Sequence, residues 1–262
     1  MSEGLLLLKF AIVIGFVLGL SIIAERLSPR LAGLISGYPT GSAISLFFFG
    51  LENGADFASQ SALYNMVGII ALQTFLYFYY IGSISFKKFE ILLSSVLAIF
   101  GYIIVICILK CLQIEGYLMV LLPLASVLLF LYLFRKIPNR KIEKSVKIDK
   151  KILFFRAFVA SLVLITIISI AQFVGPEWAG LFSAFPTTTF PLLLILHYTY
   201  GREYSNTVIK NIPISIISLL IYSLTVSITY PMYGIYLGTI VSFGTATSYL
   251  VLYYLWSKFR KK

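Results

Sequence analysis

Charged residues, histidine and cysteine are scarce in this sequence of 262 residues. Charged side chains make up 12% of the chain, whereas a typical soluble domain has about 25%. The two cysteines, Cys107 and Cys111, have no His or Asp beside them and therefore predict no metal site. The long apolar runs contain no paired carboxylates of the kind that acid–base catalysis uses. We therefore expect no enzyme, and neither a metal nor another cofactor.

Apolar residues, by contrast, are abundant. They make up 60% of the chain, the mean hydropathy is +0.96, and aromatic residues account for 16%. A soluble fold could not bury this much apolar surface, because its surface-to-volume ratio leaves too much of it exposed to water. Lipid removes that difficulty, and Tyr and Trp favour the membrane–water interface. The composition therefore predicts an integral membrane protein.

Long apolar runs give the number of membrane spans. A spanning helix needs about 20 mostly apolar residues. Runs of this kind occupy residues 5–24, 32–50, 62–83, 91–112, 117–134, 154–174, 179–200, 211–230 and 234–256. We therefore predict an all-α integral membrane fold with nine transmembrane helices.

The basic residues indicate how these spans are oriented. If the N-terminus is outside, the inner loops and the C-terminus contain every Lys and Arg except Lys9, Lys110 and Arg156. Such a bias is typical of cytoplasmic loops, so we expect the cell membrane with a cytoplasmic C-terminus. The net charge of +11 then reflects topology and not a nucleic-acid partner. The basic stretch 135–151 either serves only as this orientation signal or also binds anionic membrane lipids.

An internal repeat becomes visible when the chain is shifted by 147 residues. Residues 24–54 then align without a gap with residues 171–201. The identical pairs are Ala24/Ala171, Pro29/Pro176, Ala32/Ala179, Gly33/Gly180, Leu34/Leu181, Ser36/Ser183, Pro39/Pro186, Thr40/Thr187, Leu46/Leu193 and Gly54/Gly201. The shift equals five spans, an odd number, so equivalent helices run in opposite directions. This predicts an inverted-topology 4+1+4 repeat, an architecture common among secondary transporters. Residues 1–112 would form the first four-helix repeat, residues 113–152 a connecting helix and basic loop, and residues 153–262 the second four-helix repeat.

Two prolines at matching positions predict that the second and seventh spans are broken. A proline inside a helix removes a backbone donor and clashes with the preceding turn, and the freed carbonyls need partners in lipid. Pro191 predicts a further break in the seventh span. The candidate substrate-binding residues at the two breaks are the prolines and the hydroxyls beside them: Pro39, Thr40, Ser42, Pro186, Thr187, Thr188 and Thr189. The alternative is a pair of kinked helices in which small residues only allow close packing.

Three further residues are candidates for the same site. Lys9 and Arg156 are equivalent in the repeat and would attract an anionic group, or they extend to the interface as ordinary charges near helix ends. His197 is the only histidine and could carry a proton, or it has a simple interfacial role. Its repeat equivalent is Gly50, so the repeat gives it no support.

The string AGLFSAFPTTTFPLLLILHYTYG at residues 179–201 resembles the hallmark of the GlpM family of small bacterial inner-membrane proteins. The equivalent helix of the first half is less similar, because Gly50 and Leu51 replace the His-Tyr pair. The resemblance implies two GlpM-like units fused through an extra helix. It concerns architecture, since the family brings no assigned activity to carry over.

These features together favour a transporter or permease for a small polar or anionic solute, working by alternating access between the inverted repeats. Membrane lipids and a small molecule or ion are the expected partners. The alternative function is a lipid flippase or scramblase, or an accessory membrane subunit in envelope synthesis.

Overall fold

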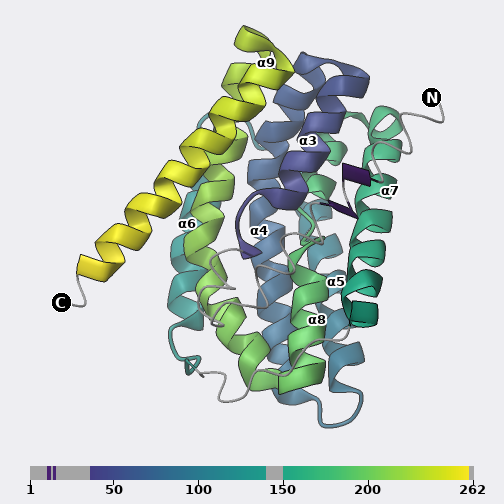
Figure 1. Ribbon diagram of the computed structural model, residues 1–262, viewed down its shortest axis with the longest axis vertical. Coiled ribbons are helices and arrows are strands. Elements are labelled where there is room, and N and C mark those ends of the chain that lie inside the picture. Colours follow the sequence, from purple (N-terminus) through teal and green to yellow (C-terminus); the bar gives the residue numbers. More distant parts are fainter. Residues whose placement is uncertain (1–10, 13, 16–35, 140–149, 260–262) are drawn as a thin grey trace.

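The computed structural model describes residues 11–12, 14–15, 36–139 and 150–259, with the backbone alone for 150–157, and this part of the chain is helical (Figure 1). Its main helices are α3 (Thr40–Asn53), α4 (Ala55–Ser85), α5 (Glu90–Cys111), α6 (Leu118–Phe134), α7 (Lys150–Ser183), α8 (Thr189–Tyr200) and α9 (Arg202–Phe259). Four of them, α4, α5, the Phe158–Ser183 part of α7, and α9, are long and apolar enough to cross a membrane.

Glycines divide the two longest helices. Gly175 in α7 has a φ of 79° and Gly234 in α9 has a φ of 77°, which are left-handed values that only glycine adopts at little cost. In Figure 1, α9 rises through the bundle, turns at the top and descends as a second limb that leans outward. At 1.5 Å per residue, its 58 residues would measure about 87 Å if straight. The turn is what lets it fold back along the bundle.

The short helices α3 and α8 lie in opposite halves of the molecule. Figure 1 shows α3 in the upper half and α8 in the lower half. Each ends at a glycine of similar conformation: Gly54 has φ 93° and ψ 163°, and Gly201 has φ 85° and ψ 168°. We refer below to the Gly54 end of the bundle, where α3 meets α4, and to the Gly201 end, where α8 meets α9.

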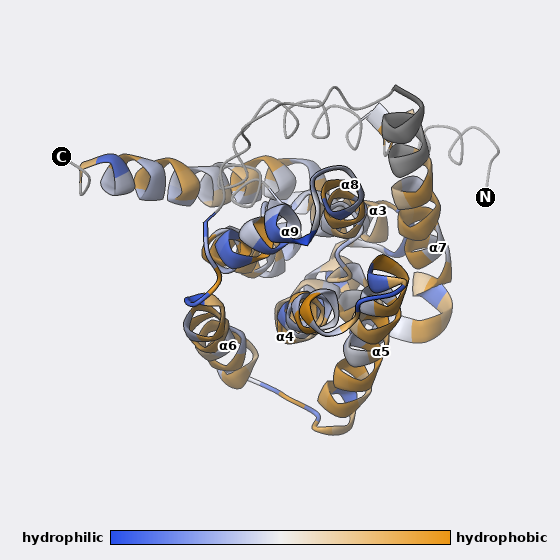
Figure 2. Ribbon diagram, turned by 90° about the horizontal axis from the view of Figure 1, so that it is seen from below, coloured by the Kyte–Doolittle hydropathy of each residue, from blue (hydrophilic) through white to orange (hydrophobic). Residues whose placement is uncertain are grey.

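The surface of the bundle is more apolar than that of a soluble protein. The rim helices α5, α6 and α7 are mainly hydrophobic in Figure 2. Large apolar side chains on them are exposed, among them Phe100, Ile103, Leu121, Leu128 and Leu162. Serines, threonines and amides are buried instead, including Ser42, Ser183 and Asn65. Apolar residues outside and hydrogen-bonded polar residues inside fit a membrane-embedded helical protein.

The elements follow the apolar runs closely, with one correction. Runs 62–83, 91–112 and 117–134 correspond to α4, α5 and α6, and runs 211–230 and 234–256 correspond to the two limbs of α9. Most of run 5–24 lies outside the described residues. The expected break at Pro191 is wrong: α8 continues through it, because Pro191 lies in the first helical turn, where a missing N–H costs nothing.

Candidate functional site

The helix is interrupted at residues 37–39 and again at 184–188, and the two interruptions share two backbone hydrogen bonds. The Thr40 N–H donates to the Tyr38 carbonyl at 2.7 Å, and the Thr187 N–H donates to the Phe185 carbonyl at 2.7 Å. Each helix then resumes with a bond to the proline carbonyl, Ala43 to Pro39 and Phe190 to Pro186, both at 2.8 Å. These bonds are related by the 147-residue shift of the sequence repeat. The two prolines therefore produce the same local turn at the two positions.

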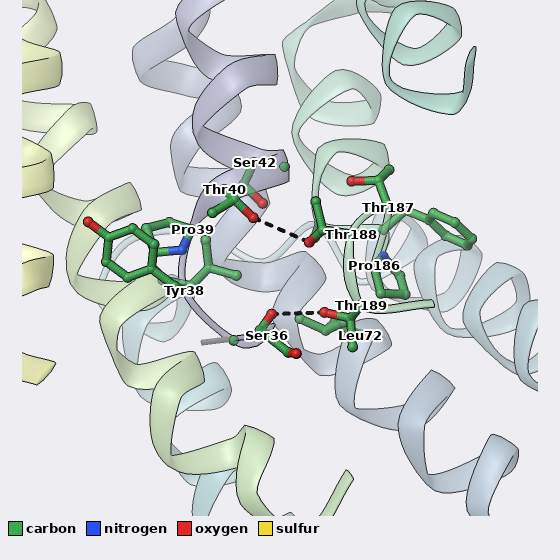
Figure 3. Close-up of a pocket in the computed structure, with 15 residues that line it drawn as sticks. Ser36, Tyr38, Pro39, Thr40, Ser42, Leu72, Pro186, Thr187, Thr188 and Thr189 are labelled. Atoms are coloured by element: carbon green, nitrogen blue, oxygen red, sulfur yellow. Dashed lines mark hydrogen bonds between the residues drawn. The ribbon is translucent and has the colours of Figure 1, made fainter. Parts of the chain in front are cut away.

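A small pocket lies between the two interruptions (Figure 3). Residues 36–42 line one side, residues 184–189 line the other, and Leu72 of α4 and Leu219 of α9 complete it. Its volume is about 30 Å³. That is room for about two water molecules, since one needs roughly 10–15 Å³ of such space. The pocket is therefore closed to any solute larger than a small dehydrated ion.

Hydroxyl groups satisfy the carbonyls at each interruption from the opposite side. The Ser42 hydroxyl donates to the Ser183 carbonyl at 2.9 Å, and the Thr189 hydroxyl donates to the Ser36 carbonyl at 2.8 Å. Ser42 and Thr189 are equivalent in the repeat, and so are Ser36 and Ser183. The two bonds are thus reciprocal, as contacts across a two-fold axis are.

A second reciprocal pair of contacts lies beside the first. The Thr40 and Thr188 hydroxyls are 3.2 Å apart, and Figure 3 shows this bond between the facing segments. At the equivalent place Thr187 faces Gly41 so closely that a Cβ on Gly41 would lie 2.3 Å from the threonine Oγ1. That oxygen is buried and has no hydrogen-bond partner in the described part of the chain. Thr187 therefore presents a free hydroxyl at the pocket.

The electrostatic character of the pocket comes from the backbone, because none of the lining residues that the structure describes carries a charged side chain. Helix α3 begins at Thr40 and α8 begins at Thr189, so both helices start at the pocket. A helix N-terminus carries a partial positive charge and unpaired N–H donors. Two such ends with threonine hydroxyls between them favour an anion or a hydrogen-bond acceptor over a cation.

Asn65 of α4 joins four chain segments on the side of the pocket towards the Gly54 end. Its amide nitrogen donates to the hydroxyls of Ser42 (3.1 Å) and Ser183 (2.7 Å). Its amide oxygen accepts from the Ser223 hydroxyl of α9 at 2.8 Å. The side chain is fully buried. A buried amide with all its partners present fixes the relative positions of these segments.

His197 lies away from the pocket, near the Gly201 end of α8. Its Nδ1 is 3.0 Å from the Tyr79 hydroxyl, and its Nε2 is 3.3 Å from a carboxylate oxygen of Glu90. Thus the seven candidates from the two proline motifs come together at one pocket, whereas His197 belongs to a separate buried group. Lys9 lies outside the described residues, as does the side chain of Arg156. No cluster of three metal-ligating side chains occurs in the described ranges.

Sequence reasoning missed Leu72, Leu219 and Glu90. The two leucines are 147 residues apart, so extending the repeat alignment beyond residue 54 would have paired them, although nothing in it marks them as pocket residues. Glu90 is far from His197 in sequence and follows no motif. Its position depends on how α5 packs beside α8, for which the sequence carries no signal.

No protein-family model, curated protein sequence or solved structure matches this chain.

Proposed function

We propose that the protein is a multi-pass membrane permease that carries a small polar or anionic solute through the pocket between the interrupted helices. It works by alternating access, with the two halves rocking about that pocket. The observation that carries the proposal is the reciprocal pair of hydroxyl–carbonyl bonds, Ser42 to Ser183 and Thr189 to Ser36, between two proline-interrupted helices. Interrupted helices at matching positions of two halves are the best sequence pointer to a transporter site.

Nine spans are the topology that best accommodates these helices. The glycine turns split α7 and α9 into limbs, and each limb of α9 exceeds the roughly 20 residues that a span needs. The end of α7 and α8 together supply one interrupted span, and α3 with the residues before it supplies the other. The first span of this proposal falls mostly outside the described residues.

Inversion of the two halves is supported by the directions of these segments. Gly180 packs on Ser61 near the start of α4, and further along Phe190 packs on Phe75 with ring centroids 5.1 Å apart, so the seventh span runs parallel to α4. In the other half Gly37 packs on Ser215 of the first limb of α9, and Gly50 packs on Ile235, directly after the Gly234 turn that ends this limb, so α3 runs parallel to the first limb. Since α4 and that limb run in opposite directions, the two interrupted helices do so as well (Figure 1).

The distribution of charge supports a cytoplasmic location for the Gly201 end. The links at this end carry basic residues, among them Lys87, Lys88, Arg135, Lys136 and Arg202. The Gly54 end carries mainly acidic residues, Glu52, Asp56, Glu115 and Glu177, with Lys110 paired to Glu177. Basic residues favour the cytoplasmic side, which corresponds to an outside N-terminus and an inside C-terminus in the cell membrane.

A small anion suits the pocket better than a cation or a lipid. Two helix N-termini and the Thr187 hydroxyl, which has no partner among the described residues, provide donors, and none of the described lining residues is a carboxylate that could neutralise a cation. A volume of about 30 Å³ describes a closed state that must widen for anything beyond a small ion. Lipid translocation would need a polar groove open towards the bilayer, which none of these contacts suggests.

The test is uptake by the full chain reconstituted into liposomes, with halides, nitrate, phosphate and acetate as probes. We expect transport of at least one anion, and Thr187→Val should reduce that transport by about tenfold, because a hydrogen bond to a charged group contributes about 1.5–3 kcal/mol. Thr166→Val is the matched control: Thr166 is exposed on α7 and bonds only its own helix, at Leu162. Its transport should equal that of the wild type.

The same liposomes distinguish the alternative. If no anion is taken up while labelled lipids exchange between leaflets, the protein is a scramblase or flippase and the permease proposal is wrong. Equal transport by Thr187→Val and wild type would leave the permease intact but remove the pocket as its site. A first screen for the solute can use stability, since a ligand at 100 times its Kd adds about 2.7 kcal/mol to the free energy of unfolding.

A further inference from the structure

A buried titratable group lies at the Gly201 end, away from the pocket. His197 of α8, Tyr79 of α4 and Glu90 at the start of α5 meet there, with contacts of 3.0 Å from His197 Nδ1 to the tyrosine oxygen and 3.3 Å from Nε2 to the carboxylate. The histidine side chain is fully buried. Its Nε2 makes no hydrogen bond within the described part of the chain, although the Glu90 oxygen is within ion-pair range.

The group has no counterpart in the other half of the molecule. Under the 147-residue shift, His197 corresponds to Gly50, Tyr79 to Val226 and Glu90 to Leu237. Gly50 packs there against the apolar side chain of Ile235. The three equivalent positions at the Gly54 end thus carry no titratable side chain. The fold does not require the three polar residues, so their presence at one end needs a functional reason.

Glu90 connects the buried histidine with water. Its side chain is 36% exposed. It lines an open pocket of about 650 Å³ at the Gly201 end together with Lys87, Arg202 and Glu203. Protons can therefore reach the carboxylate from the aqueous side, while the histidine behind it stays shielded.

The arrangement suits the reversible binding of one proton. The charged groups that face the ring are the Glu90 carboxylate from α5 and the Arg202 guanidinium from α9, and the Tyr79 hydroxyl faces it from α4. A proton on Nε2 makes an imidazolium that pairs with the carboxylate. Without it, the carboxylate faces a neutral ring. Histidine is the side chain whose ordinary titration range lies nearest physiological pH.

We infer that His197, Glu90 and Tyr79 form a proton-binding site, open to the cytoplasmic side, that supplies the coupling proton of the permease; the coupling role rests on the proposed function. A hydronium ion protonates the Glu90 carboxylate and leaves a water molecule, and Glu90 passes the proton to Nε2 of His197. The carboxyl O–H bond breaks, the N–H bond forms, and the carboxylate is regenerated beside the imidazolium. Tyr79 holds the ring through Nδ1 and positions it for this transfer.

The site acts on the pocket through α8. His197 follows Thr189 by about two helical turns, roughly 12 Å along the axis. The ring of Phe190, which follows Thr189, lies against the ring of Tyr79 with centroids 6.5 Å apart. Protonation changes the attraction between the far end of α8 and α5, and α8 begins at the solute pocket. The proton and the solute thus bind at opposite ends of one short helix.

The first experiment measures the proton directly. Because the chain has a single histidine, NMR of ¹⁵N-histidine-labelled protein, purified without a histidine tag and placed in lipid nanodiscs, reports one ring. We expect the ring to change from the neutral to the charged form as the pH is lowered. Glu90→Gln should shift that titration to lower pH by roughly one pH unit, since an opposite charge at this distance favours the charged form. Tyr198→Phe is the control, since Tyr198 is an exposed neighbour on α8.

A ring signal that stays in one form at every pH at which the protein remains folded, or a Glu90→Gln titration that overlays the wild type, would overturn the proton site whatever the protein transports. Coupling is measured in the liposomes with whichever probe anion is carried. We expect several-fold faster uptake with an inward proton gradient in the wild type and in Tyr198→Phe, and no gradient dependence in His197→Gln. If anion uptake by the wild type does not depend on the proton gradient, proton coupling is contradicted. If no anion is carried at all, the permease proposal fails, and the NMR titration still decides the proton site.

Discussion

The two sides of the pocket are held closed in different ways. On the Gly54 side, Asn65 joins Ser42, Ser183 and Ser223 through three hydrogen bonds. On the Gly201 side, the positions equivalent to Asn65 and Ser223 are Ile212 and Leu76, both fully or almost fully buried, and the bond from Thr189 to Ser36 remains. Opening the Gly54 side must break a buried amide network, whereas opening the Gly201 side mainly separates apolar surfaces. We therefore expect the Gly201 side to open more readily.

The largest expected effect comes from removing the amide. Asn65→Leu should lower the free energy of unfolding by about 3 kcal/mol, because it removes three buried hydrogen bonds and leaves the Ser223 hydroxyl without its acceptor. The measurement is denaturant unfolding in detergent, followed by circular dichroism.

A matched asparagine tests whether the network or the residue type matters. Asn211 is also buried, next to the equivalent position 212, but its amide nitrogen bonds only the carbonyl of Thr207 in its own helix. Asn211→Leu should cost less than about 1 kcal/mol. Equal losses of unfolding free energy in the two variants would mean that the Asn65 network does not hold the Gly54 side closed more strongly than an ordinary buried asparagine would.

The reciprocal bonds allow a second test of the same difference. Ser42→Ala should cost about 2 kcal/mol, because it strips both the Ser183 carbonyl and the Asn65 amide of a partner. Thr189→Val removes a single bond, to Ser36, and should cost about 1 kcal/mol. Thermal and denaturant unfolding of both variants give the comparison. A larger loss in Thr189→Val would reverse the assignment of the stronger side.

The smallest expected effect concerns the residues before the two prolines. Tyr38 bonds the Thr247 hydroxyl at 2.7 Å, while its counterpart Phe185 has no hydroxyl. Tyr38→Phe should therefore change the free energy of unfolding by at most about 0.5 kcal/mol, as this contact is exposed. Tyr102→Phe is a useful contrast, since the fully buried Tyr102 hydroxyl donates to the Leu181 carbonyl and its loss should cost about 1.5 kcal/mol. A change above 1 kcal/mol in Tyr38→Phe would show that this hydroxyl holds the second limb of α9 in place.

The sequence predicts some of these features for clear physical reasons. Prolines fix the positions of both helix breaks, because the missing N–H and the ring clash act locally. The place of the neighbouring threonines at the breaks is predictable for the same local reason, because they follow the prolines directly in the sequence. The predicted break at Pro191 is wrong, because the effect of this proline depends on where α8 begins and not on the proline alone. The resemblance to GlpM stays a prediction.

Long-range partners are a different matter. Asn65 is a polar residue in an apolar span, and only packing shows that it has three partners. Glu90 stands at an exposed helix start, where a solvated carboxylate is the ordinary expectation. Its contact with His197 depends on the approach of α5 and α8, and no sequence periodicity records that approach. The repeat equivalents of Tyr79 and Glu90 are the apolar residues Val226 and Leu237. This difference points to a polar group at one end only once the contact between Glu90 and His197 is known.

The packing of each interrupted helix also bears on how the chain is made. Residues of each interrupted helix contact a long helix of the other half: Gly37 packs on Ser215 of α9, and His197 bonds Tyr79 of α4. When residues 1–112 have entered the membrane, Ser42 still lacks the Ser183 carbonyl, and Gly37 lacks the surface of Ser215. We thus expect the hydroxyl-bearing segment of the first half to lack its hydrogen-bond and packing partners until the second half is synthesised. We therefore expect assembly of this protein to be a late, post-insertion event, in which two separately expressed halves become stable only when they meet in the same bilayer.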